Sequence, residues 1–125
     1  MIWLDMAEKL RFTIDGNVYY AGLRKNPLAE QIAAMCPFEL DYTRSGGHEY
    51  YAALPEQVSA KGCEATTKGR RNGLYYFEGW NAFSLVFRDC DTAPYQIHCV
   101  GDFEESMSAV LEITGGSVHI LCETG

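Results

Sequence analysis

LRFTIDGNVYYAGL, residues 10–23, is the stretch that decides the fold. Its first half alternates three apolar residues, Leu10, Phe12 and Ile14, with polar ones, which is the period of a strand with one buried face. Asp-Gly-Asn at 15–17 then provides turn chemistry, because glycine tolerates the positive φ that a tight turn requires. The second half is again rich in strand-forming residues. The stretch therefore predicts a β-hairpin.

Further strands are predicted along most of the chain. Aromatic, β-branched and other apolar runs indicate them at 38–42, 49–54, 74–77, 83–87, 95–100 and 118–122. In the run 95–100, Ile97 and Cys99 share the face that we expect to be buried, and Gly101 is expected to end the strand. Residues 43–48 contain glycines and predict a loop. Residues 56–72 lack sustained periodicity, which indicates a long surface excursion.

Two short helices are also predicted. Asn26 can cap a helix that begins at Pro27, and this helix should end near Cys36, which precedes a proline. Asp102, with a glutamate three residues later, resembles a capping box, and the apolar residues that follow form a helical stripe. A pair of glycines beginning at Gly115 provides the stop.

About eight strands joined mainly by short turns favour a mainly β protein built as a closed antiparallel barrel, because closure removes exposed sheet edges. Two helices of this length can plug the open ends. The alternative is a two-layer α+β sandwich with both helices on one face of a sheet. At 125 residues the chain has room for one core. We expect a tail at residues 1–9 and a single domain at 10–125.

The charge balance restricts the possible partners. A formal net charge of −7 repels polyanions at long range, so neither nucleic acid nor an anionic membrane is an expected partner. A small basic run at 68–71 lies beside glycines and is expected to be a solvated loop. No phosphate loop or dinucleotide-binding fingerprint occurs, and no cofactor is expected. The oligomeric state is left open.

The cysteines and the first residues indicate a cytoplasmic location. Five cysteines are an odd number with no C-x-x-C spacing, so reduced thiols are the simplest interpretation. The opening residues carry two carboxylates and no basic segment of the kind that begins a secretory signal. Cys63 and Cys90 fall in predicted loops, and the sequence leaves their reactivity open. The histidines lack the further ligands that a metal site would need, so no metal is expected.

The order of elements resembles a family of small bacterial cyclophilin-like proteins. The likeness depends on the hairpin, on the helix opened by Asn26-Pro27, on the segments 49–55 and 73–87, and on Val100-Gly101 before the last helix and strand. It extends from about Leu10 to the end of the chain. The resemblance implies an eight-stranded barrel with a helix at each end, which is the fold of the prolyl isomerases called cyclophilins.

The resemblance does not imply isomerase activity. Cyclophilins usually carry their active site on a segment of the type F-H-R-x-I-x-x-F-M-x-Q-G-G, and no part of this chain matches it. Some members of the small bacterial family occur beside flavodoxin-like domains, which implies a possible role as an interaction module for a redox partner.

Candidate site residues come from one loop and from the aromatic strands. An isomerase needs a donor aimed at the imide nitrogen, and Arg44 is the best arginine for this role, although a plain surface arginine is the alternative. Trp80-Asn81 lies between two predicted strands, where an indole beside an amide could bind a ring or a peptide. Because strand neighbours alternate, half of the aromatic residues should be core and the rest could line a groove. The predicted ligand-binding residues are Arg44, His48, Tyr50, Trp80, Asn81 and Phe83.

The function predicted from these features is a non-catalytic barrel that binds a small molecule or an extended peptide in an aromatic groove. The alternatives are a weak prolyl isomerase and a module that binds a flavodoxin-like partner.

Overall fold

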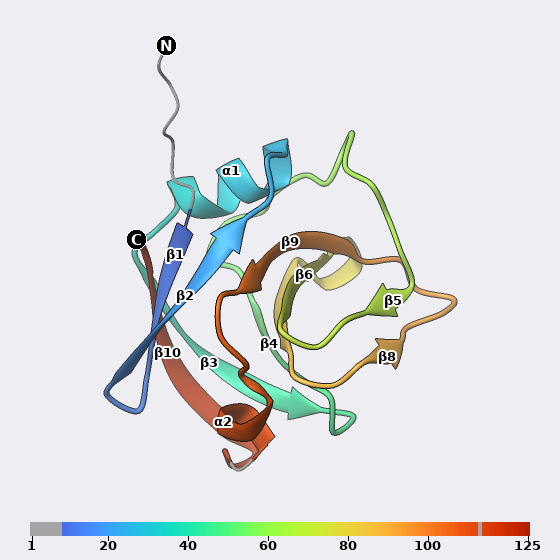
Figure 1. Cartoon of the computed structure of the whole chain (residues 1–125). Coiled ribbons are helices and arrows are strands. Elements are labelled where there is room, and N and C mark those ends of the chain that lie inside the picture. Colours follow the sequence, from blue (N-terminus) through green and yellow to red (C-terminus); the bar gives the residue numbers. More distant parts are fainter. Residues whose placement is uncertain (1–8, 113) are drawn as a thin grey trace.

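The structure is a computed structural model that describes residues 9–112 and 114–125, and its strands close into an eight-stranded antiparallel barrel. The order around the barrel is β1-β10-β3-β4-β7-β6-β9-β2 (Figure 1). The strands are β1 Lys9–Ile14, β2 Asn17–Leu23, β3 Phe38–Ser45, β4 Glu49–Ala53, β6 Gly73–Phe77, β7 Ala82–Val86, β9 His98–Phe103 and β10 Ser117–Thr124. The barrel prediction is confirmed, and the sandwich alternative is wrong.

The predicted hairpin forms one side of this barrel. Strands β1 and β2 pair in the register Ile14 to Asn17, which leaves two turn residues, Asp15 and Gly16, both at positive φ. This is the turn geometry that matches the right-handed twist of paired strands. Of the expected tail, residues 1–9, only Lys9 belongs to the described part of the chain, and it is the first residue of β1.

Two helices lie at opposite ends of the barrel (Figure 1). Helix α1, Pro27–Ala34, begins as predicted, and the side chain of Asn26 accepts a hydrogen bond of 2.8 Å from the amide of Ala29. Helix α2, Ser108–Glu112, is much shorter than predicted. Asp102, which was expected to cap it, belongs to β9 instead, because residues 101–103 pair with residues 21–23 of β2. Strand pairing therefore overrides the local capping signal.

Strand β9 corrects a second prediction. Leu74 pairs with Gly101 whereas Tyr75 pairs with Cys99. Val100, between Cys99 and Gly101, is therefore the extra residue of a β-bulge. The bulge turns Val100 into the core, where it is fully buried. Ile97 is buried as expected and Cys99 is half-buried, but both belong to a small apolar cluster on the outer face of the barrel, and Gly101 continues the strand. The predicted loop at 43–48 is also shorter, because β3 extends to Ser45.

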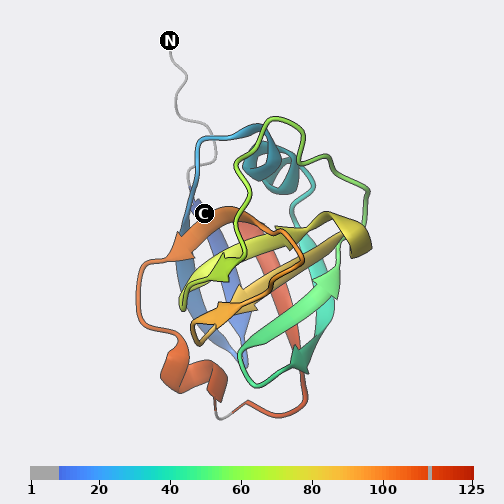
Figure 2. The ribbon, with the colours of Figure 1, turned by 90° about the vertical axis from the view of Figure 1, so that its right-hand side faces the viewer.

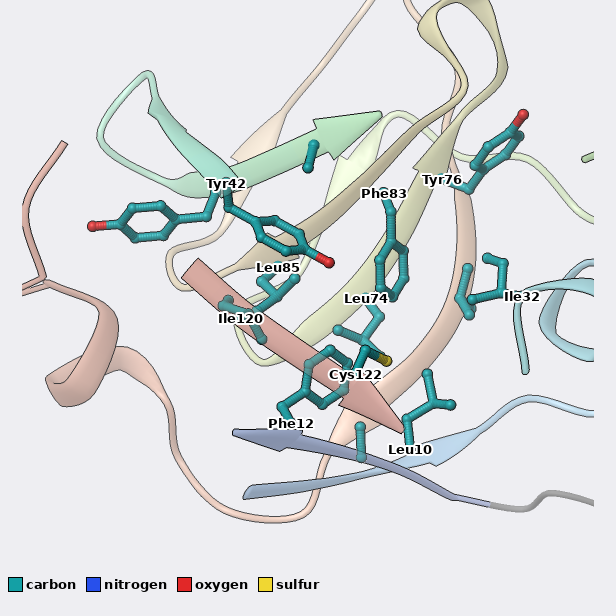
Figure 3. Close-up of a cluster of buried hydrophobic side chains, with 14 of the residues drawn as sticks. Leu10, Phe12, Ile32, Tyr42, Leu74, Tyr76, Phe83, Leu85, Ile120 and Cys122 are labelled. Carbon is teal, nitrogen blue, oxygen red and sulfur yellow. The ribbon is translucent and has the colours of Figure 1, made fainter. Parts of the chain in front are cut away.

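The interior of the barrel is filled by side chains. Figure 3 shows labelled side chains from β1, β3, β6, β7, β10 and α1 converging there. The rings of Phe12 and Phe83 lie 6.3 Å apart, and those of Phe12 and Phe103 lie 5.0 Å apart. Packing of this kind leaves the interior as a core rather than a channel. Any binding site of the barrel would therefore lie on its outer surface.

Two short strands form a ribbon outside the barrel. Strand β5, Lys68–Gly69, pairs with β8, Cys90–Asp91, and an isolated bridge joins Thr66 to Ile97. We call residues 66–69 and 90–97 the covering ribbon. It crosses in front of the barrel wall formed by β6 and β7 (Figure 2). The excursion predicted at 56–72 thus ends in ordered structure that belongs to the site described next.

Candidate functional site

A pocket of about 370 Å³ lies between the covering ribbon and the outer face of β4, β7 and β6. Alternation along the strands decides which side chains reach it. In β4, Glu49 and Tyr51 point outward into the pocket, while Tyr50 between them is fully buried in the core. In β7 the outward residues include Ser84, whose neighbour Phe83 is again in the core. The pocket therefore uses the face of the wall that the core leaves free.

One end of the pocket is a group of aromatic rings. The ring of Phe77 stands nearly perpendicular to those of Trp80 and Tyr95, at interplanar angles of 75° and 77° and centroid distances of 5.7 and 5.9 Å. Tyr51 lies 6.1 Å from Trp80 on the other side. We call these four residues the aromatic end. Trp80 and Tyr95 are 68% and 63% exposed, more than any other large apolar side chain in the described part of the chain.

The covering ribbon is tied down by contacts of its own. The amide of Thr92 donates a hydrogen bond of 2.7 Å to the carbonyl oxygen of Thr67, and Lys68 forms an ion pair with Asp91. On the side of the ribbon that faces the barrel wall, its residue Ile97 packs against Tyr75 and Val86 in a small apolar cluster separate from the core. The floor of the pocket is thus apolar and held in place before any ligand arrives.

The polar groups of the pocket are few. Among the lining residues in the described part of the chain, Glu49 is the only carboxylate, and none is a lysine, arginine or histidine. Burial raises the pKa of the Cys90 thiol above its ordinary value, and the negative charge of Glu49 raises this pKa further. Burial likewise raises the pKa of Tyr75, whose hydroxyl accepts a hydrogen bond from the amide of Arg70. Cys90 is therefore present as a neutral thiol at neutral pH.

The structure brings one of the six predicted site residues, Trp80, into this pocket. Tyr50 and Phe83 are fully buried on the opposite side of the barrel wall. His48 lies beside Glu49, with its Nε2 atom 3.4 Å from Oε2 of that carboxylate, but it is not a lining residue.

The side chain of Arg44 binds the C-terminal end of helix α2 and does not line the pocket. Its Nη1 atom donates hydrogen bonds of 2.9 Å to the carbonyl oxygens of Glu112 and Thr114, and its guanidinium lies 4.8 Å from the ring centre of Phe87. A cation at this position satisfies carbonyl groups that the end of a helix leaves free. Arg44 and Trp80 therefore do not meet in one site.

Asn81 holds a turn. It adopts a left-handed conformation with φ 50°, and its Nδ2 atom donates a hydrogen bond of 2.9 Å to the carbonyl oxygen of Glu56. Its Oδ1 atom accepts hydrogen bonds from the amide of Val58 and from the hydroxyl of Tyr76. These contacts fix the turn that carries Trp80, so Asn81 positions the aromatic end without lining it.

The six predicted binding residues did not include the rest of the pocket lining. Tyr51 could be found from alternation, because its neighbour Tyr50 belongs to the core. Tyr95 and Ile97 could not, since they reach the pocket only when the covering ribbon folds back over the wall.

Other chemistry-bearing groups lie elsewhere. The sulfur atoms of Cys36 and Cys122 are 3.9 Å apart beneath helix α1, and all five cysteines are free thiols. Among residues 9–112 and 114–125, no three His, Cys, Asp or Glu side chains are grouped so that they could hold a metal ion. No helix in these same residues is long and apolar enough to cross a membrane.

Comparisons with known proteins agree with this architecture. A model of the cyclophilin-like family matches residues 12–123 of the chain. The solution structure of a hypothetical protein from Archaeoglobus fulgidus is similar, with a TM-score of 0.71 over 94% of this chain and 95% of that one. Its sequence is 16% identical, so the likeness concerns the fold alone. A search of curated proteins found no match.

Proposed function

Because this chain belongs to the cyclophilin-like family, whose barrel is a scaffold that does not itself define an activity, we propose a function from the site: the protein binds a small molecule in its outer pocket. The observation that carries this proposal is the aromatic end. Two rings that are each more than 60% exposed stand at the mouth of a preformed apolar pocket. Apolar surface of this kind gains stability when a ligand covers it.

The size of the pocket favours a small molecule over an extended peptide. Pockets for small ligands usually measure about 300 to 1,000 Å³, and this one lies within that range at about 370 Å³. A peptide would need a continuous groove or a free strand edge. The closed barrel leaves no free edge among its eight strands.

The two alternatives receive no support from a specific observation. An isomerase needs a donor in the pocket, and Arg44 is occupied by carbonyl groups at and just beyond the end of helix α2. Nothing in the described residues or in the comparisons favours a flavodoxin-like partner. We keep a cytoplasmic location as part of the proposal, because five unbridged cysteines suit a reducing compartment.

A thermal-shift screen of small molecules, followed by variants, tests the proposal. A ligand that binds only the folded state raises the melting temperature by mass action. We expect Trp80→Ala to abolish most of this rise for any hit. Tyr20→Ala is the matched control, because Tyr20 is an exposed aromatic residue on β2 that does not line the pocket.

Three outcomes contradict the proposal: no compound stabilises the wild-type protein, Trp80→Ala leaves every hit unaffected, or proline-containing peptides bind while small molecules do not.

A further inference from the structure

The pocket has two chemically different ends on one strand. The aromatic end includes Tyr51, and the carboxylate of Glu49 lies two residues earlier on the same face of β4. A two-residue step along an antiparallel strand is roughly 7 Å. A ligand of the size that fits the pocket therefore contacts both ends at once.

Within residues 9–112 and 114–125, the carboxylate of Glu49 forms no ion pair with a lysine or an arginine. Its ion-pair partner within the described residues is His48, at 3.4 Å, and this contact carries charge only when the imidazole is protonated. The side chain of Glu49 is 23% exposed and borders an apolar floor. A carboxylate in such surroundings is more stable with a positive partner than without one.

The surrounding charges reinforce the negative potential. Asp89 and Asp91 flank Cys90, and together with Glu49 they oppose ionisation of its thiol. The nearest basic side chain on the covering ribbon, Lys68, is already paired with Asp91. A ligand anion would meet this field without any lysine or arginine in the lining to receive it.

We propose, building on the small-molecule function above, that the ligand is an arylalkylamine whose ring packs against the aromatic end and whose ammonium group binds Glu49. The perpendicular rings of Phe77, Trp80 and Tyr95 offer both faces and edges to an incoming ring. An ammonium group supplies the charge-assisted hydrogen bond that Glu49 lacks. A two-carbon linker between ring and ammonium spans a distance comparable with the separation of the two ends.

Three probes with the same phenyl group separate charge from shape: phenylethylamine, phenylethanol and phenylpropionate. We expect amide-resolved NMR titrations of the wild-type protein to give the tightest dissociation constant for the amine. The amine should bind about three- to tenfold more tightly than the alcohol, as for a partly exposed ion pair, and the carboxylate should bind most weakly. In Glu49→Gln the advantage of the amine should disappear.

Two further variants complete the test. Glu56→Gln removes the same charge from an exposed residue outside the lining, and it should preserve the order of the probes. Trp80→Ala should weaken the amine and the alcohol by the same factor, because both use the ring. The NMR spectrum of each variant also shows whether it is folded.

The inference is overturned if the amine and the alcohol bind equally to the wild-type protein, if Glu49→Gln keeps the preference, or if none of the three probes shifts the pocket residues. In the first two cases the small-molecule function stands, because a ligand still occupies the pocket. If none of the probes binds, the thermal-shift screen decides separately whether the pocket takes other small molecules.

Discussion

Replacing Tyr50 with phenylalanine tests whether this residue is structural or belongs to a binding site. Its hydroxyl lies 2.7 Å from the carbonyl oxygen of Thr114 and 2.6 Å from that of Gly115, and it accepts a hydrogen bond from Arg44. One proton can be donated to one carbonyl at a time, so Tyr50→Phe removes one donated and one accepted hydrogen bond. At about 1 kcal/mol each, the expected loss of unfolding free energy is about 2 kcal/mol.

Tyr42→Phe is the matched control. Tyr42 is another core tyrosine, but its buried hydroxyl has no hydrogen-bond partner within the described residues, and burial raises its pKa. Removing an unsatisfied buried hydroxyl should leave the unfolding free energy unchanged or raise it by about 1 kcal/mol. Both substitutions delete the same oxygen from a fully buried ring, so their difference isolates the hydrogen bonds.

Urea denaturation of the two variants and the wild-type protein measures this difference. At an unchanged m-value, Tyr50→Phe should lower the midpoint and Tyr42→Phe should not. Because Tyr50 is buried on the far side of the barrel wall, neither substitution should alter ligand binding in the outer pocket. Equal losses of stability in the two variants would refute the hydrogen-bond argument. A loss of ligand binding in Tyr50→Phe would show that Tyr50 belongs to the binding site after all.

Three further predictions concern the turn at Asn81, the close approach of β2 and β9 at Gly101, and a surface histidine. Asn81→Ala should be less stable than Asn81→Gly by about 1 kcal/mol in urea denaturation, because alanine is strained at a φ of 50°; equal stabilities would contradict this. Gly101→Ala should lose about 2 kcal/mol or more, because its β-carbon would collide with the carbonyl oxygen of Gly22, whereas Gly22→Ala meets no atom within 4 Å and should cost much less. Hydrogen bonds to two carboxylates raise the pKa of His119 above its ordinary value, so its contribution to stability is complete below the unfolded-state pKa and is lost as the pH rises through the raised folded-state value. NMR titration of the imidazole should show this raised pKa in the wild-type protein and a lower one in Glu39→Gln.

Much of the fold could be predicted from local patterns. The hairpin at 10–23 and the start of helix α1 depend on residues close in sequence, and both formed as expected. Phe83, Leu85 and Phe87 alternate along the predicted strand 83–87, which places them on one face, and all three are fully buried. The bulge in β9 could not be predicted, because it depends on how distant strands pair.

The candidate site was predictable only in part, for the same reason. Alternation correctly implied that half of the aromatic residues would face outward: Tyr51, Tyr75 and Trp80 line the pocket, and Tyr50, Tyr76 and Phe83 fill the core. Which of two neighbouring residues faces outward, as in Tyr50 and Tyr51, is decided only when the barrel closes. The contribution of the covering ribbon depends on contacts between residues far apart in sequence, which leave no local pattern.

Amide-resolved NMR of the protein with a mixture of small aromatic and amine fragments tests most directly whether the outer face of β4, β7 and β6 is the binding site. We predict shift changes at Glu49, Tyr51, Tyr95 and the indole of Trp80. Shift changes confined to the second cavity, near Asp15, Val110 and His119, or no shift changes at all, would contradict this prediction.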